Sequence, residues 1–124
     1  MATKKQVTAS PSSENIVVIR GAVRAEPVLR ALPSDDVLLT FDLVSGADAD
    51  RRTVPVSWQG PTRSLPKVAV DDRLMILGTV QRRFFRVGGS NAHAVDVRAE
   101  VIARTSTAKR NLCAEVIRRL DEAA

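Results

Sequence analysis

Arginines and aromatic rings lie side by side in the segment RRFFR, at residues 82–86 of a 124-residue chain. A guanidinium group can hold a phosphate, and an aromatic face can stack on any base for roughly 1 to 3 kcal/mol. Alternation along the strand-like run 73–85 places Phe84 on the apolar, core-like side and Phe85 on the opposite side with Arg83. The pattern predicts an exposed Phe85 ring among phosphate-binding arginines, namely Arg82, Arg83 and Arg86. Alternatively, Phe85 closes the end of a barrel and the arginines are simply solvated.

Two further arginines and the single tryptophan allow two interpretations each. Arg20 and Arg24 share one side of the apolar run 15–24, where they either extend a basic surface or only solubilise an outer face. Trp58 is in register with the valines of its own run, so periodicity alone buries it. A tryptophan at a strand end can also stack on a ligand, and the pattern leaves both roles open.

Enzymatic and metal chemistry find little support in these residues. His93 is the only histidine and Cys113 the only cysteine, which excludes an internal disulfide and a metal site built from histidines. The carboxylate pairs at 35–36 and 71–72 are typical of turns, and Gly88–Gly89 is typical of a hairpin rather than a phosphate loop. We therefore expect no enzymatic activity, no metal and no cofactor.

The charge balance points loosely to a polyanionic partner. Lys and Arg number 19 against 14 Asp and Glu, for a net charge of +5, spread along the whole chain. The acidic residues gather in expected turns, whereas the arginines lie in expected strands. No apolar run approaches the roughly 20 residues of a membrane span, and residues 1–13 are polar, so we expect a cytoplasmic protein without a membrane partner.

Short runs rich in Val, Ile and Leu, separated by turn clusters, predict an all-β domain over residues 15–104. Residues 1–14 read as a disordered arm. The expected strands are 15–24, 37–44, 52–58, 73–85 and 91–104. The long first and fourth strands each contain a glycine, Gly21 and Gly78, where a barrel strand bends or bulges. Five strands with an insertion after the third are the plan of the five-stranded OB-fold Greek-key barrel.

Two segments outside the strands complete the organisation. Residues 59–72 contain two prolines and allow one short helical turn. Residues 105–124 predict a C-terminal α-helix capped by Thr107. Its apolar stripe comprises Leu112, Cys113, Val116, Ile117 and Leu120. We expect Cys113 to be a small buried residue, and the stripe to dock on its own barrel, on another subunit or on another protein.

Three segments together resemble the bacterial single-stranded DNA-binding proteins, in a form similar to actinobacterial variants. They are NIVVIRGAVRAEPVLR at 15–30, VLLTFDLV at 37–44 and RLMILGTVQRRFFR at 73–86. The resemblance implies an OB-fold that binds single-stranded DNA as a tetramer or dimer and serves DNA replication, recombination or repair at the nucleoid. By position it makes Phe85 and Trp58 stacking residues, and Arg82, Arg83 and Arg86 the residues that follow the DNA backbone.

Two departures from that family alter the expectation. Residues 45–53 contain no aromatic, and Arg52 stands where one is expected, so arginine–phosphate contacts must supply more of the affinity and binding should be unusually sensitive to salt. The helix also replaces the family's long tail with an acidic tip, which recruits partners. The competing hypothesis is therefore an OB-fold adaptor with weak or no DNA binding that acts through this helix. Stacking and phosphate contacts do not distinguish DNA from RNA, so RNA is a third possible ligand.

Overall fold

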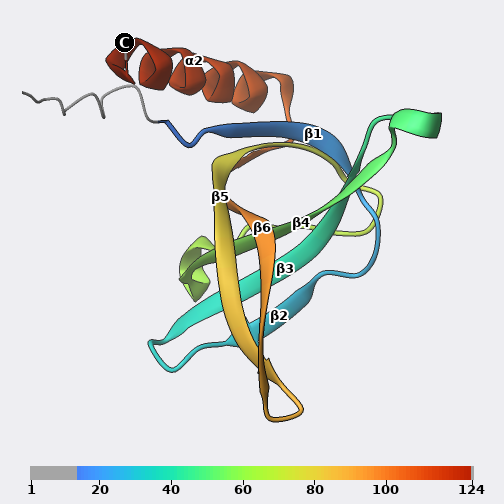
Figure 1. Cartoon of the computed structure of the whole chain (residues 1–124). Helices are drawn as coiled ribbons and strands as arrows, with labels where there is room; N and C mark the ends of the chain where they lie inside the picture. The colour runs from blue at the N-terminus through green and yellow to red at the C-terminus, as the bar shows by residue number, and fades with distance from the viewer. Residues whose placement is uncertain (1–13, 124) are drawn as a thin grey trace, which may run out of the picture.

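The computed structural model describes residues 14–123, which form a mostly β domain with one C-terminal helix (Figure 1). The strands are β1 Val17–Val23, β2 Val28–Ala31, β3 Asp36–Ser45, β4 Arg52–Pro61, β5 Arg73–Val87 and β6 Ser90–Ala103. The helical segments are the short 3-10 turns η2 Asp48–Asp50 and η3 Thr62–Ser64 and the long helix α2 Ser106–Ala123. The mostly β class, the short turn after β4 and the C-terminal helix are confirmed. The predicted disordered arm lies outside the described residues except at its last position, Glu14.

The expected number of strands is wrong, because the described chain has six strands rather than five. Five of them match the predicted strands to within three residues at each end. The additional strand, β2, pairs only with β3, and all four of its residues are exposed. An edge strand of this kind is held by backbone hydrogen bonds, so no buried alternation marks it in the sequence.

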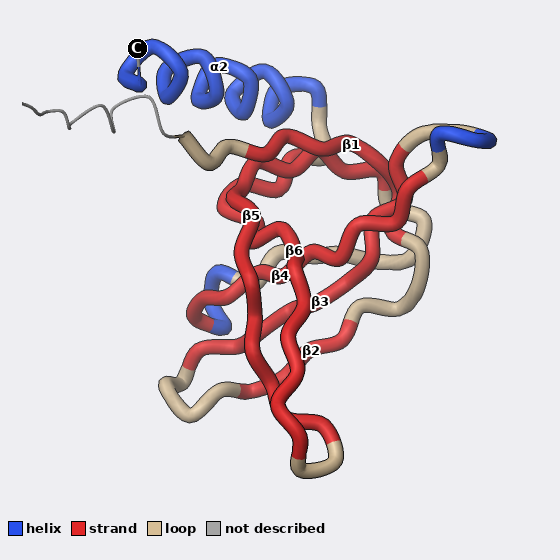
Figure 2. The backbone as a smooth tube through the Cα atoms, in the orientation of Figure 1, coloured by secondary structure: helices blue, strands red, loops and turns tan. Residues whose placement is uncertain are grey.

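The strands curve round into a barrel-like arrangement (Figure 2). Their order is β1-β5-β6-β4-β3-β2, and β1 also pairs with β3. Two pairings of this circuit are short. The β1–β3 pairing joins Ala22 to Val44 and Val23 to Leu43, and the parallel β4–β6 pairing joins Val56 to Val97 and Ser57 to Arg98.

The inner faces of the strands enclose the main core. Its buried members are Val23, Leu39, Phe41, Leu43, Val56, Leu74, Ile76, Val97 and Ala99. Alternate residues of β3 and β4 therefore face inward, and those between them face outward. The outward-facing set includes Leu38 and Thr40 on β3 and Ser57 and Gln59 on β4.

The two glycines predicted at bends lie where backbones approach closely. A Cβ on Gly21 would lie 2.2 Å from the Val44 carbonyl oxygen, where β1 passes from β5 to β3. A Cβ on Gly78 would lie 2.0 Å from the Arg98 carbonyl oxygen. At the second position the β5–β6 register shifts, so that one residue of β6, Glu100, has no partner on β5.

Beyond Gly78, β5 and β6 continue as a paired hairpin that extends past the rest of the barrel (Figure 1). The side chain of Asn15 fixes the point where the hairpin leaves the barrel. Its amide nitrogen donates to the Val80 carbonyl and its oxygen accepts from the Val80 N–H, both at 2.9 Å. The Asn15 side chain thus adds two hydrogen bonds to β5 beyond Val17 and Gly78, the last backbone pair between β1 and β5.

Helix α2 packs on the outside of the barrel through a second apolar cluster. Leu112 is buried against Leu77 and Ala103, and Val116 lies beside them. Arg119 adds ion pairs to Glu100 on β6 at 2.8 Å and to Glu115 on the helix at 2.9 Å. Hydrogen bonds from Arg118 and then Arg119 lower the pKa of Glu115 from 4.5 to about 2, so this network stays charged at neutral pH.

Two expectations for the helix need correction. Thr105 rather than Thr107 caps it, since the Thr105 hydroxyl accepts the Ala108 N–H at 3.1 Å. Cys113 is exposed, not buried. Of the stripe whose docking the sequence left open, Leu112 and Val116 pack on the barrel, whereas Ile117 and Leu120 are exposed.

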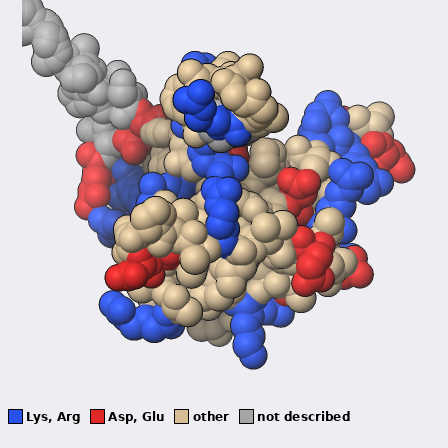
Figure 3. Space-filling view, turned by 90° about the horizontal axis from the view of Figure 1, so that it is seen from below, with Lys and Arg blue, Asp and Glu red and all other residues tan. Residues whose placement is uncertain are grey.

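Charge is distributed as the sequence indicates. The acidic turn residues Asp35, Asp48 and Asp71 adopt the left-handed backbone conformation that tight turns use. On the face seen in Figure 3, basic side chains form several separate groups rather than one continuous patch. Among residues 14–123, no helix is long and apolar enough to cross a membrane.

Candidate nucleic-acid interface

A groove lies between the outward faces of β3 and β4, which form its floor, and the β5–β6 hairpin, which forms its other side. On β5, Gln81 and Arg83 share the side of the strand that is turned toward this floor. Gln81 crosses to β4, where its amide nitrogen donates to the Ser57 hydroxyl at 3.1 Å. Ser57 is almost fully buried as a result, although it belongs to the outward-facing set.

Three adjoining hollows of about 310, 390 and 140 Å³ make up this groove. Arg83 lines all three of them. We call their union the arginine groove. The hollow of about 310 Å³ is lined by Arg30, Leu32, Leu38, Ser57, Gln59, Gln81, Arg83, Phe84 and Arg98. No described acidic side chain lines that hollow, whereas Glu26, Asp42 and Asp96 line the hollow of about 390 Å³.

Arg83 already forms an ion pair with the buried carboxylate of Asp96. Its Nε lies 2.7 Å from Oδ2 of Asp96, whose side chain is 2% exposed, whereas that of Arg83 is 34% exposed. The contact is close but poorly aligned, and neither Asp96 oxygen accepts a hydrogen bond from the described residues. Asp96 therefore depends on Arg83 for compensation of its charge, and Arg83 brings little net positive charge to the groove.

Arg30 and Arg98 are the groove's available cations. Arg30 lies on β2 opposite Leu38, and Arg98 lies on β6 opposite Ser57. Both are exposed, and neither forms an ion pair with another residue of the described range. Two unpaired guanidinium groups that line one hollow with no described carboxylate favour the binding of phosphate.

Phe84 supplies the exposed ring, which corrects the prediction that it belongs to the core. It is 74% exposed, and its ring centroid lies 6.1 Å from that of His93 on β6. The predicted side of β5 is correct, since Phe84 shares it with Leu74 and Ile76, and Phe84 therefore lines the hollow from the opposite side of β5 to Gln81 and Arg83. The core ends before Phe84, however, because the hairpin continues beyond the barrel.

The two predicted stacking residues are placed differently. Trp58 pairs with Leu39, is half-buried and packs against the main core, with its ring over Gly60. It therefore lies on the opposite face of β4 from Ser57 and Gln59. The side chain of Phe85 lies outside the described part of the structure, and the backbone shows only that Phe85 pairs with Ala92.

The remaining predicted arginines do not converge with the groove. Arg82 is exposed on the same side of the hairpin as Phe84, and Arg86 donates to the Gly89 carbonyl at 3.2 Å at the hairpin tip. Arg52 donates to the carbonyls of Ala49 at 3.1 Å and Arg51 at 2.9 Å, which stabilises the β3–β4 turn. Arg24 is exposed after β1, and Arg20 lines a different hollow.

Sequence reasoning missed Arg30, Arg98 and Phe84 as groove residues. Arg98 alternates with the buried residues Val97 and Ala99, and this alternation alone marks it as facing outward. Neither Arg30 nor Phe84 could be assigned to the groove without the position of β2 and the length of the hairpin.

The groove offers a ligand two unpaired guanidinium groups, polar side chains and one exposed ring. Within residues 14–123, no group of three or more His, Cys, Asp and Glu side chains is placed to hold a metal ion. Comparison of the chain with models of known protein families gives no match, and neither does comparison with curated proteins. The function is therefore inferred from the geometry of the groove.

The Arg83–Asp96 pair predicts a specific effect on stability. Replacing Arg83 with Ala leaves a buried carboxylate without compensation and should lower the free energy of unfolding by about 3 kcal/mol, at the low end for buried pairs because Arg83 is partly exposed. Arg82→Ala, the matched control on the other side of the strand, should change it by no more than about 0.5 kcal/mol. Urea denaturation measures both.

The double variant Arg83→Ala, Asp96→Asn separates the ion pair from packing. Because it removes the charge as well as its partner, it should be more stable than Arg83→Ala alone. An Arg83→Ala variant as stable as Arg82→Ala would show that Asp96 does not depend on Arg83.

Proposed function

We propose that the chain binds single-stranded DNA, with little sequence preference, along the arginine groove. The observation that carries the proposal is that Arg30, Arg98 and Phe84 line one hollow of about 310 Å³. Two unpaired guanidinium groups can hold successive phosphates while the exposed ring stacks on a base. No step of this binding requires a catalytic group or a cofactor.

The arrangement of the strands supports an OB-fold as the framework for this function. In such barrels, oligonucleotides bind across the second and third strands, between the loops that flank them. If β2 is regarded as part of the loop after β1, the arginine groove lies on the second and third barrel strands, β3 and β4. The β5–β6 hairpin then corresponds to the loop between the fourth and fifth strands.

The stacking role moves from Trp58 to Phe84 in this proposal. Phe84 is exposed and lines the groove, whereas Trp58 faces the core side of β4. With one exposed ring among the described side chains of the groove, most of the affinity comes from charge, so binding should weaken steeply as salt is added. We infer that the protein acts as a homo-oligomer, in the cytoplasm at the nucleoid, where DNA replication, recombination or repair exposes single strands.

The double variant Arg30→Ala, Arg98→Ala tests the groove directly. It should weaken oligo-dT binding at about 50 mM salt by tenfold or more, because each arginine binds about one phosphate. The slope of log K against log salt should become shallower by about 1.4, at about 0.7 for each phosphate that the variant no longer neutralises. Fluorescence anisotropy of a labelled oligonucleotide gives both quantities.

A control with the same reduction in charge is Arg63→Ala, Arg110→Ala. Arg63 lies on η3 and Arg110 on α2, away from the groove, so this variant should bind nearly as well as the natural chain. Equal weakening in the two double variants would show that net charge, not the groove, governs binding. Repeating the titration with RNA of matched sequence identifies the preferred nucleic acid.

One observation favours the adaptor function as a second candidate. Ile117 and Leu120 are 61% and 52% exposed on α2, in line with Cys113. The flanking charges are paired within the helix, Arg118 with Glu115 and Glu122, so a second copy of this helix would meet little repulsion. We therefore infer that a second copy of the chain is the partner of this stripe.

Replacing both Ile117 and Leu120 with Ser should shift the mass measured by light scattering toward the monomer, since each substitution removes apolar area from the interface. The helix itself should remain docked, because Leu112 and Val116 are unchanged. If this variant dissociates and the natural chain never binds oligo-dT, the adaptor function replaces DNA binding. An unchanged mass would argue against the stripe as an interface.

A further inference from the structure

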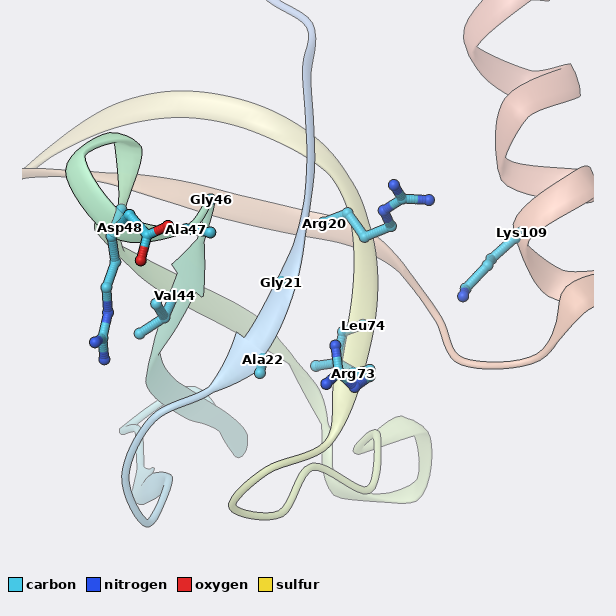
Figure 4. Close-up of a pocket in the computed structure, with 11 residues that line it drawn as sticks. Arg20, Gly21, Ala22, Val44, Gly46, Ala47, Asp48, Arg73, Leu74 and Lys109 are labelled. Atoms are coloured by element: carbon cyan, nitrogen blue, oxygen red, sulfur yellow. The ribbon is translucent and has the colours of Figure 1, made fainter.

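A second basic hollow, of about 610 Å³, lies apart from the arginine groove (Figure 4). It is bounded by β1, the start of β5, the first turns of α2 and the turn between β3 and β4. Its basic side chains are Arg20, Arg51, Arg73 and Lys109. None of the residues that line it also lines the arginine groove.

Three of the four cations of this hollow come from separate elements and lie around the same space. In Figure 4, the side chains of Arg20 on β1 and Lys109 on α2 extend toward one another across the space between strand and helix, and Arg73 on β5 lies below them. None of these three forms an ion pair with a residue that the structure describes. Asp48, the one carboxylate in the lining, lies beyond β1 from Lys109 (Figure 4).

The wall opposite the helix is held in a fixed shape by its own hydrogen bonds. In the β3–β4 turn, the Asp50 N–H donates to the Ala47 carbonyl at 3.0 Å, and the Arg51 N–H donates to the Asp48 carbonyl at 3.2 Å. The guanidinium of Arg52 binds two further carbonyls of the same turn. A wall that is already ordered loses little conformational entropy when a ligand binds.

The lining residues define the chemistry of the ligand. Unlike the arginine groove, the hollow has no aromatic ring among the described residues that line it, and the side chains between the cations are small or aliphatic. It therefore offers charge without a surface on which a base could stack. The chemical group that fits several guanidinium and ammonium groups around an open space is phosphate.

We propose that this hollow is a second phosphate-binding site. Phosphate groups could reach it from two sources, a free polyphosphate or the backbone of a single strand that continues from the arginine groove around the barrel. The site does not rest on the proposed function, because it shares no residue with the groove. Its failure and the failure of the groove can therefore be observed separately.

The experiment uses the full chain and the double variant Arg20→Ala, Lys109→Ala, with Arg63→Ala, Arg110→Ala as the control of equal charge. Arg110 follows Lys109 on the same helix but does not line the hollow. The probes are sodium tripolyphosphate, measured by calorimetry, and oligo-dT of about 8 and about 40 nucleotides, the shorter being long enough for one barrel only. Circular dichroism verifies that α2 is retained, and Arg73→Ala provides an independent second variant.

We expect the hollow variants to bind tripolyphosphate about tenfold more weakly than the control, because each cation removed takes a charged hydrogen bond with it. If the strand backbone also uses the site, binding of the longer oligonucleotide weakens while that of the shorter one does not. If only tripolyphosphate binding weakens, free polyphosphate is the ligand. The proposal is overturned if the natural chain binds neither tripolyphosphate nor the longer oligonucleotide, or if the hollow variants bind both as well as the control does. If the hollow variants also bind the shorter oligonucleotide more weakly than the control does, that strand is not held by the arginine groove alone, and the result counts against the groove proposal.

Discussion

The register shift between β5 and β6 at Gly78 is the constraint on which the candidate site depends. Side chains alternate with a period of two, so one extra residue, Glu100, exchanges the two faces of β6 beyond it. With the shift, Val97 joins the barrel core and Asp96 faces the groove. Without it, the carboxylate would enter the core and the valine would face outward. The shift needs glycine at residue 78, because any Cβ there would overlap the neighbouring backbone.

This arrangement separates the basic residues into groups with different roles. Arg83 compensates Asp96, whereas Arg30 and Arg98 keep their charge available. Arg20, Arg73 and Lys109 converge on the other hollow, and Arg52 is used within a turn. A net charge of +5 that is diffuse along the chain thus becomes two local concentrations of unpaired cations in the fold. A protein of this kind would bind phosphate groups by position rather than by total charge.

Local pattern predicted most of the framework but little of the site. Alternation located five strands and the sides of β5 correctly, and the glycines marked the two close approaches. Alternation assigned Phe84 to the core because it identifies the side of a strand on which a residue lies. It does not show at which residue along the strand the core ends. It also missed Arg30, since β2 is an edge strand with no buried residue, and the partnership of Arg83 with Asp96, which only the shifted register creates. The site depends on such long-range pairings, which no local window contains.

The central claim is that single-stranded DNA occupies the arginine groove, and nuclear magnetic resonance of the labelled chain tests it most directly. On addition of oligo-dT, the largest backbone shift changes should fall on the outward-facing residues of β3, β4 and the hairpin, with the strongest effects at Leu38, Gln59, Phe84 and Arg98. The indole N–H of Trp58, which faces the core side, should move less. Changes concentrated on α2 near Ile117, or no change at low salt, would contradict this account.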